Sequence, residues 1–130
     1  MSDGGAAGVL AEAVVGALRQ VSGLSSVADG EPIQAGDAYA ILDMGPEIDW
    51  GHKTGAGAEI RFAVLVRCGG ERPDRARRLL TAAREQVGAI GPAADGWRLV
   101  SLAMLRARVV REPGPRWTGA AEYRARLLAE

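Results

Sequence analysis

Aromatic side chains are scarce in this chain, which contains three Trp, two Tyr and one Phe among its 130 residues. Because 48% of the residues are nevertheless hydrophobic, the core must be built mainly from Ala, Val, Leu and Ile. A chain of this length fits one domain and buries about two thirds of the surface of its unfolded state. We therefore expect a single domain over residues 1–130, with residues 1–5 as a loose terminus.

Cysteine is limited to Cys68. A single cysteine forms no internal disulfide and is typical of a reducing compartment. The sequence does not open with a basic segment followed by an apolar one, as a signal peptide would. No apolar run approaches the roughly 18 residues that a membrane span requires. These absences predict a soluble protein of the cytoplasm without a membrane partner.

Residues suited to catalysis or metal binding are equally few. His52 is the only histidine, and one His with one Cys does not make a zinc site. No group of carboxylates has the spacing of a calcium site. The segment Gly51–Gly55 lacks the Gly-Lys-Ser/Thr sequence and the following helix of a phosphate-binding loop. We therefore expect no catalytic residue, no cofactor and no metal. A small enzyme that uses His52 with a carboxylate is the alternative.

The basic residues are nearly all arginine, since Lys53 is the only lysine. Residues 1–60 carry nine acids and two bases, whereas residues 61–130 carry seven acids and fourteen bases. Opposite charges in the two parts of a neutral chain favour head-to-tail packing between copies. The alternative is that both parts share one compact surface, in which case the asymmetry disappears in three dimensions.

Hydrophobic residues recur at helical spacing in two segments, from about residue 6 to 20 and from about residue 74 to 87. Proline 73 suits the first turn of the second helix. The predicted buried faces consist of Leu10, Val14, Ala17, Leu18 and Val21 in the first helix, and of Ala76, Leu79, Leu80, Ala83 and Val87 in the second.

Alternating hydrophobic and polar residues make 59–68 the clearest predicted strand. Further strands are predicted over residues 38–43, 97–111 and 117–128, the last two forming an antiparallel hairpin. Residues 25–37 are expected to be a loop, with a short edge strand near Ile33. The Gly-rich segment from Met44 to Ala58 is expected to be a long loop. The order α-β-β-α-β-β predicts an α+β fold, with two helices on one face of a mainly antiparallel sheet of about four strands.

Arginines are concentrated in the two final strands. Arg106, Arg108, Arg124 and Arg126 occupy even positions, so the two pairs are expected to share one face of the sheet. No standard motif of a sequence-specific DNA-binding protein is present. We interpret these residues as a solvated face or a subunit contact. A further possibility is that they line a passage through which DNA slides without sequence reading.

Three regions of the sequence, taken in order, carry a family resemblance. They are the N-terminal helix with a Gly/Asp loop and the strand 39–43; the segments 49–54, 59–67 and 69–70; and the helix 74–87 with segments 97–100, 117–119 and 123–126. Together they resemble the tail-completion, or tail-terminator, proteins of long-tailed phages and of phage-derived gene transfer agents. The resemblance spans nearly the whole chain. One departure is the Pro-Gly-Pro turn at 113–115, where a shorter polar turn is expected.

The resemblance implies a structural subunit rather than an enzyme. Proteins of this family form a ring, typically of six subunits, that ends the growth of the tail tube and offers a docking surface to the head. The implied partners are other copies of the chain, the tail tube protein, the head-side connector or stopper protein, and DNA passing through the ring without sequence reading. The implied location is the head–tail junction of a phage or gene transfer agent particle, assembled in the bacterial cytoplasm.

Candidate contact residues follow from the same interpretation. Trp50, in the segment 44–58, is predicted to be a buried anchor against a neighbouring subunit or the tube, beside His52 and Lys53. The alternative is that Trp50 packs on its own domain.

A second group of contacts is predicted on the outer face of the second helix. Arg75, Arg77 and Arg78 are expected there to pair with the acidic N-terminal half of the next copy, with plain solvated charge as the alternative. Two other functions remain open: another head–tail connector or tail-tube subunit, and a small non-specific DNA-binding protein.

Overall fold

The structure, a computed structural model, describes residues 5–32 and 36–130. In these residues the elements are α1 (Gly5–Leu18), β1 (Ser26–Asp29), β2 (Ala38–Asp49), β3 (Gly57–Gly69), α2 (Asp74–Gly88), β4 (Ala93–Ala94), β5 (Trp97–Glu112) and β6 (Arg116–Ala129). Residues 1–4 of the predicted loose terminus lie outside the described residues. Gly5, also placed in that terminus, is instead the first residue of α1.

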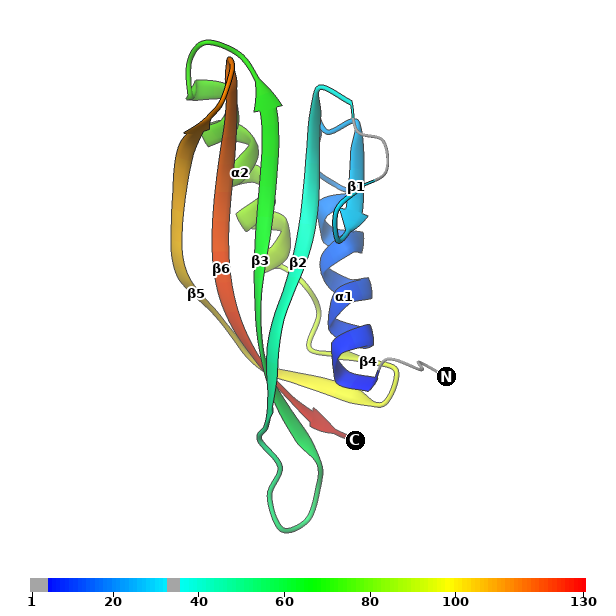
Figure 1. Cartoon of the computed structure of the whole chain (residues 1–130). Helices are drawn as coiled ribbons and strands as arrows, with labels where there is room; N and C mark the ends of the chain where they lie inside the picture. Colours follow the sequence, from blue (N-terminus) through cyan, green and yellow to red (C-terminus); the bar gives the residue numbers. More distant parts are fainter. Residues whose placement is uncertain (1–4, 33–35) are drawn as a thin grey trace.

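The strands form one sheet in the order β1-β2-β3-β6-β5-β4. β1 runs parallel to β2, and all the other neighbouring pairs are antiparallel. Both helices lie behind the sheet in Figure 1, so that one face is covered and the other is open. The predicted α+β class, with two helices on one face of a mostly antiparallel sheet, is confirmed.

The covered face contains the hydrophobic core. In β3 the even-numbered residues from Ala58 to Cys68 are buried against the helices, while the odd-numbered residues point to the open face. In β6 the pairing reverses the parity, and Ala121, Tyr123 and Ala125 are buried. The rings of Phe62 and Tyr123 stack with their centroids 5.0 Å apart. Full burial of a Val, Leu or Phe side chain stabilises the fold by about 1.5–3 kcal/mol.

The helices bury the faces that the sequence predicts, except that Ala17 of α1 is only half-buried. Gly119 explains why α2 can lie close to β6. A Cβ atom at this position would approach Leu80 Cβ to 3.2 Å, which is tighter than an ordinary van der Waals contact. The missing side chain therefore makes room for the helix.

The strand β1 was not predicted, because residues 25–37 were interpreted as a loop. Ser26–Asp29 pairs with Tyr39–Leu42, and no local alternation marks so short a segment. Its structure depends on β2, which supplies the hydrogen-bonding partners. The short edge strand predicted near Ile33 falls outside the described residues.

The predicted long loop over residues 44–58 is wrong. β2 continues to Asp49 and β3 begins at Gly57, so a projecting hairpin replaces the loop. We call residues 44–58 the arm; it extends beyond the rest of the sheet in Figure 1. Its turn is closed by hydrogen bonds from the Trp50 amide to the Gly57 carbonyl (3.0 Å) and between His52 and Gly55.

Two glycines of the arm allow backbone segments to approach each other closely, and they do not mark a loose loop. A Cβ atom at Gly57 would lie 2.7 Å from the Trp50 carbonyl oxygen, and one at Gly45 would lie 2.8 Å from the Arg61 carbonyl oxygen. The register of β2 and β3 shifts between Met44 and Glu47. Gly45 and Pro46 thus sit in a bulge on the outer strand, a place that tolerates proline.

Candidate interaction surfaces

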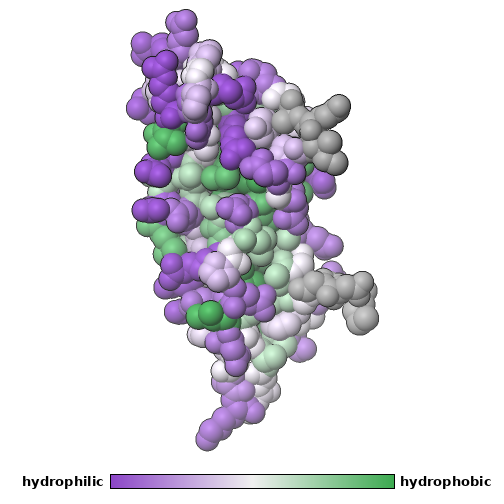
Figure 2. Space-filling view, viewed as in Figure 1, coloured by the Kyte–Doolittle hydropathy of each residue, from purple (hydrophilic) through white to green (hydrophobic). Residues whose placement is uncertain are grey.

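The first candidate surface is the open face, defined by the odd-numbered residues of β3, the even-numbered residues of β6 and the residues paired with them. The register places all four predicted arginines here: Arg106 opposite Glu122, Arg108 opposite Ala120, Arg124 opposite Ala103 and Arg126 opposite Ser101. Figure 2 shows this face with hydrophilic side chains distributed over it and more apolar ones between them.

Two of these four arginines are neutralised within the chain. Arg106 pairs with Glu122, and Arg126 pairs with Glu59 across β3 and β6 with an N–O distance of 2.9 Å. The Glu59 side chain is only 13% exposed, so this ion pair is partly shielded from water and salt. Both arginines therefore have structural roles that the sequence does not reveal.

The other two arginines have a different environment. Among the described residues, neither Arg108 nor Arg124 forms an ion pair. The Arg124 Nε atom has no exposed surface and no hydrogen-bond partner. Directly opposite Arg124 across β3 and β6 lies Arg61, which is exposed.

Arg61 was not predicted as a site residue. Its odd position in β3 puts it on the polar face of the strand, which the sequence shows clearly. What the sequence does not contain is the pairing of β3 with β6, which brings Arg61 beside Arg124.

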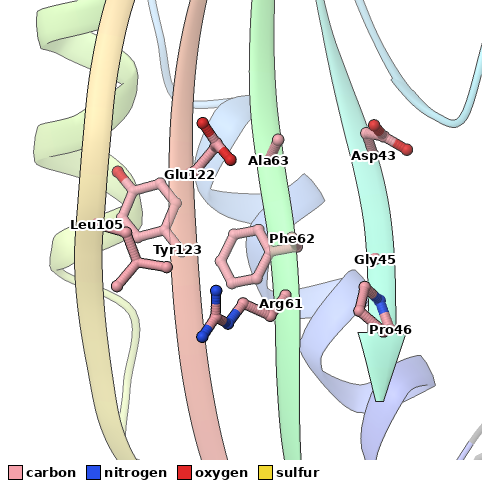
Figure 3. Close-up of a pocket in the computed structure, with 9 residues that line it drawn as sticks. All are labelled: Asp43, Gly45, Pro46, Arg61, Phe62, Ala63, Leu105, Glu122 and Tyr123. Carbon is pink, nitrogen blue, oxygen red and sulfur yellow. The ribbon is translucent and has the colours of Figure 1, made fainter.

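A shallow pocket of about 190 Å³ lies on the open face. Figure 3 labels its lining residues, which come from β2, β3, β5 and β6: Asp43, Gly45, Pro46, Arg61, Phe62, Ala63, Leu105, Glu122 and Tyr123. Its two carboxylates belong to Asp43 and to Glu122, and the latter is already paired with Arg106. The pocket offers an open, mixed polar and apolar surface rather than an enclosed cavity.

The second candidate surface is the arm. Trp50 is half-buried, and the Arg126 guanidinium lies 5.3 Å from the centroid of its ring. Such a cation–π contact contributes about 0.5–1 kcal/mol at an exposed site. Trp50 thus packs partly on its own domain, and its role as an anchor for another molecule stays a prediction. His52 and Lys53 are exposed at the tip of the arm.

The third candidate surface is the outer face of α2. Arg75 donates a hydrogen bond to the Asp37 carboxylate, and the Arg75 guanidinium lowers the pKa of the Asp37 carboxyl. Arg77 and Arg78 are exposed, and neither forms an ion pair in the described residues. Two of the three predicted contact arginines on this helix therefore remain available to a partner.

Reactive groups are few in the described part of the chain. Cys68 faces the core, and burial raises the pKa of its thiol. Residues 5–32 and 36–130 contain no group of three or more His, Cys, Asp or Glu side chains placed to hold a metal ion. No helix in these ranges is both long and apolar enough to cross a membrane.

Comparison with solved structures gives an informative match. No family model and no curated protein matches the sequence. Among solved structures, a chain of the virion of a native gene transfer agent particle matches with a TM-score of 0.68 and 28% sequence identity. The match covers 96% of this chain and 98% of the other. The chain is similar to a gene transfer agent virion protein. The similarity covers nearly the whole chain, and the matched protein is a component of a virion.

Proposed function

We propose that the chain is a structural subunit of a gene transfer agent particle, and specifically its tail terminator. In this role a ring of copies ends the growth of the tail tube and joins the tail to the head connector. The observation that carries the proposal is the full-length match to a gene transfer agent virion protein. The order of sequence features that resembles tail terminators supports the more specific assignment.

The directions of the strands support ring formation. β2 and β5 have free outer edges at residues 43–49 and 100–112, because among the described residues β1 pairs only with 39–42 and β4 only with 97–98. β2 and β5 run antiparallel to each other. If copies keep the same orientation around an axis, the β2 edge of one copy meets the β5 edge of the next in antiparallel fashion, which is a productive strand pairing.

The two free edges also lie at the same level along the strand direction. Residues 43–49 of β2 are level with residues 58–63 of β3, and these are in register with residues 122–127 of β6 and 99–106 of β5. A rotation without translation therefore brings the two edges together, which is the condition for a closed ring. The number of subunits expected from the family resemblance is six.

The remaining surfaces are assigned by their chemistry. The open face, with its arginines, lines the ring and meets DNA that passes without sequence reading. The arm, with Trp50, His52 and Lys53, and the α2 arginines contact neighbouring copies, the tube protein or the head-side connector. The ring assembles in the bacterial cytoplasm and sits at the head–tail junction.

Deletion of the gene in its source, followed by electron microscopy of the particles, tests the proposal. We expect overlong tubes beside unjoined, DNA-filled heads, and restoration of normal particles by the wild-type gene. Absence of tubes would instead indicate a tube subunit, and unjoined tubes of normal length would indicate a connector. Normal, fully joined particles would exclude all three roles.

A further inference from the structure

The arginines of the open face differ in how they are neutralised, and the difference singles out one pair. Arg106 and Arg126 are matched by Glu122 and Glu59, and Arg67 is matched by Glu31 at 3.1 Å. The first two pairs neutralise the rows of the face that contain Glu122 and Arg126 of β6. The row between them holds Arg61 directly opposite Arg124, and no carboxylate is paired with either.

Two like charges directly opposite each other on a sheet destabilise the pairing of their strands. The Cβ atoms of such partners lie about 4.5–5.5 Å apart, so the two guanidinium groups repel without an anion between them. The Nε–H of Arg124 is itself buried without a hydrogen-bond partner, so contact with an oxyanion falls to the terminal nitrogens of its guanidinium group. An oxyanion bound between the two arginines would relieve the repulsion, and guanidinium donors suit such a ligand well.

We propose that Arg61 and Arg124 form the main contact of the open face with the phosphate backbone of DNA. This inference rests on the proposed function, which brings DNA to this face, and it changes the predicted set of contact residues. Arg61 enters the set, whereas Arg106 and Arg126 leave it because their charges are satisfied within the chain. Arg108, at the margin of the same face, is a secondary contact.

The physical consequence is weak binding of DNA that does not depend on its sequence. After the internal ion pairs are set aside, the face retains the positive charges of Arg61, Arg98, Arg108, Arg116 and Arg124 against the carboxylates of Asp43 and Glu112. A duplex would be attracted to this surface without being held at any particular sequence. That balance suits a passage through which DNA has to move.

The first test measures the affinity of the purified protein for a duplex of arbitrary sequence as the salt concentration is varied. Each phosphate contact contributes about −0.9 to the slope of log K against log salt, so Arg61→Gln with Arg124→Gln should reduce the slope by about two. The matched control is Arg77→Gln with Arg78→Gln, which removes the same charge from α2 and should leave the slope unchanged. A thermal unfolding curve checks that both proteins are folded.

A second control removes an internal pair. Arg106→Gln with Glu122→Gln leaves the net charge unaltered, and the slope should stay at the wild-type value. If this variant lowers the slope as much as the Arg61 and Arg124 variant does, the proposal is overturned. The same holds if the wild-type protein does not bind duplex DNA at low salt. Should the double variant fail to fold, Arg61→Gln alone, at an exposed position, is expected to lower the slope by about one.

The second test uses complete particles from a strain in which the variant replaces the wild-type gene. We expect tails of normal length joined to heads, together with a loss of DNA transfer to recipient cells. Overlong or unjoined tails would mean that the pair contacts a protein, and unaltered transfer would mean that it contacts nothing essential; either result overturns the inference. Because tail length reports on the terminator role and the salt slope reports on the arginine pair, failure of one proposal is distinguishable from failure of the other.

Discussion

Replacing Gly57 with alanine tests whether the arm is held by close packing of its two strands. A Cβ atom at this position would lie 2.7 Å from the Trp50 carbonyl oxygen and 2.8 Å from Leu128 Cδ2. The leucine side chain can move, but the Trp50 carbonyl cannot move freely. It belongs to the same residue whose amide donates a hydrogen bond to the Gly57 carbonyl. The turn must therefore open or shift.

The expected loss of stability follows from two opposing effects. Overpacking of this kind costs about 1–3 kcal/mol. Replacement of glycine by alanine also restricts the unfolded chain, which stabilises the fold by about 0.4–1 kcal/mol. The net result is a destabilisation of about 1–2 kcal/mol, and the melting temperature should fall by about 3–5 °C for each kcal/mol in a domain of this size.

Gly55→Ala is the matched control because it lies in the same turn. A Cβ atom there meets no atom closer than His52 Cε1 at 3.7 Å, which is an ordinary contact. Its melting temperature, followed by circular dichroism, should equal or exceed that of the wild type. Equal melting temperatures for the two variants would refute the close-packing argument and favour a loose loop at the tip.

Three further predictions concern other parts of the chain. Gly16→Ala, in the middle of α1 with no atom within 4 Å of the added Cβ, should stabilise the protein by about 0.5–1 kcal/mol in chemical denaturation. Because the neighbouring Arg75 lowers the pKa of Asp37, the ion pair stabilises the fold above the unfolded carboxyl pKa of 3.8 and is lost as the pH falls through the lower folded value. Arg75→Gln should therefore raise the Asp37 pKa in an NMR titration, and an unchanged value would contradict the contact. The buried Cys68 thiol, whose pKa is raised by burial, should react with a thiol reagent in the denatured protein but only very slowly in the native one.

The elements that depend on local patterns could be predicted from the sequence. The alternation in β3 and the helical spacing in α2 each have one buried face, and hydrophobic periodicity records that directly. The arm could not be predicted in this way because Gly45 and Gly57 are ordinary signals of a loop. Their actual role, close backbone approach, becomes visible only when β2 and β3 are paired.

The candidate surfaces show the same division between local and distant information. Even spacing placed Arg106 with Arg108 and Arg124 with Arg126, as the period of a strand requires, and the register of β5 and β6 brings the two pairs to one face. It did not indicate which charges are free. Arg126 meets Glu59 from a position 67 residues away, and Arg61 meets Arg124 only through the register of β3 and β6. Net charge along the sequence therefore overstates the positive charge that this face can offer.

A subunit with two free sheet edges must also avoid pairing before its partner is present. Here each edge is interrupted: β2 shifts register around Gly45 and Pro46, and β5 shifts between Leu99 and Ser101 and again between Met104 and Arg106. Bulges and an edge proline twist the strands and remove donors, which weakens pairing between free copies. If the proposed ring is correct, the edges should join mainly when the end of a tail tube holds neighbouring copies in the same orientation. Copies held on the tube have already lost most of their translational and rotational freedom, so pairing of the interrupted edges no longer has to offset that loss of entropy. The features that keep the free chain from aggregating would thus make its assembly depend on the finished tube.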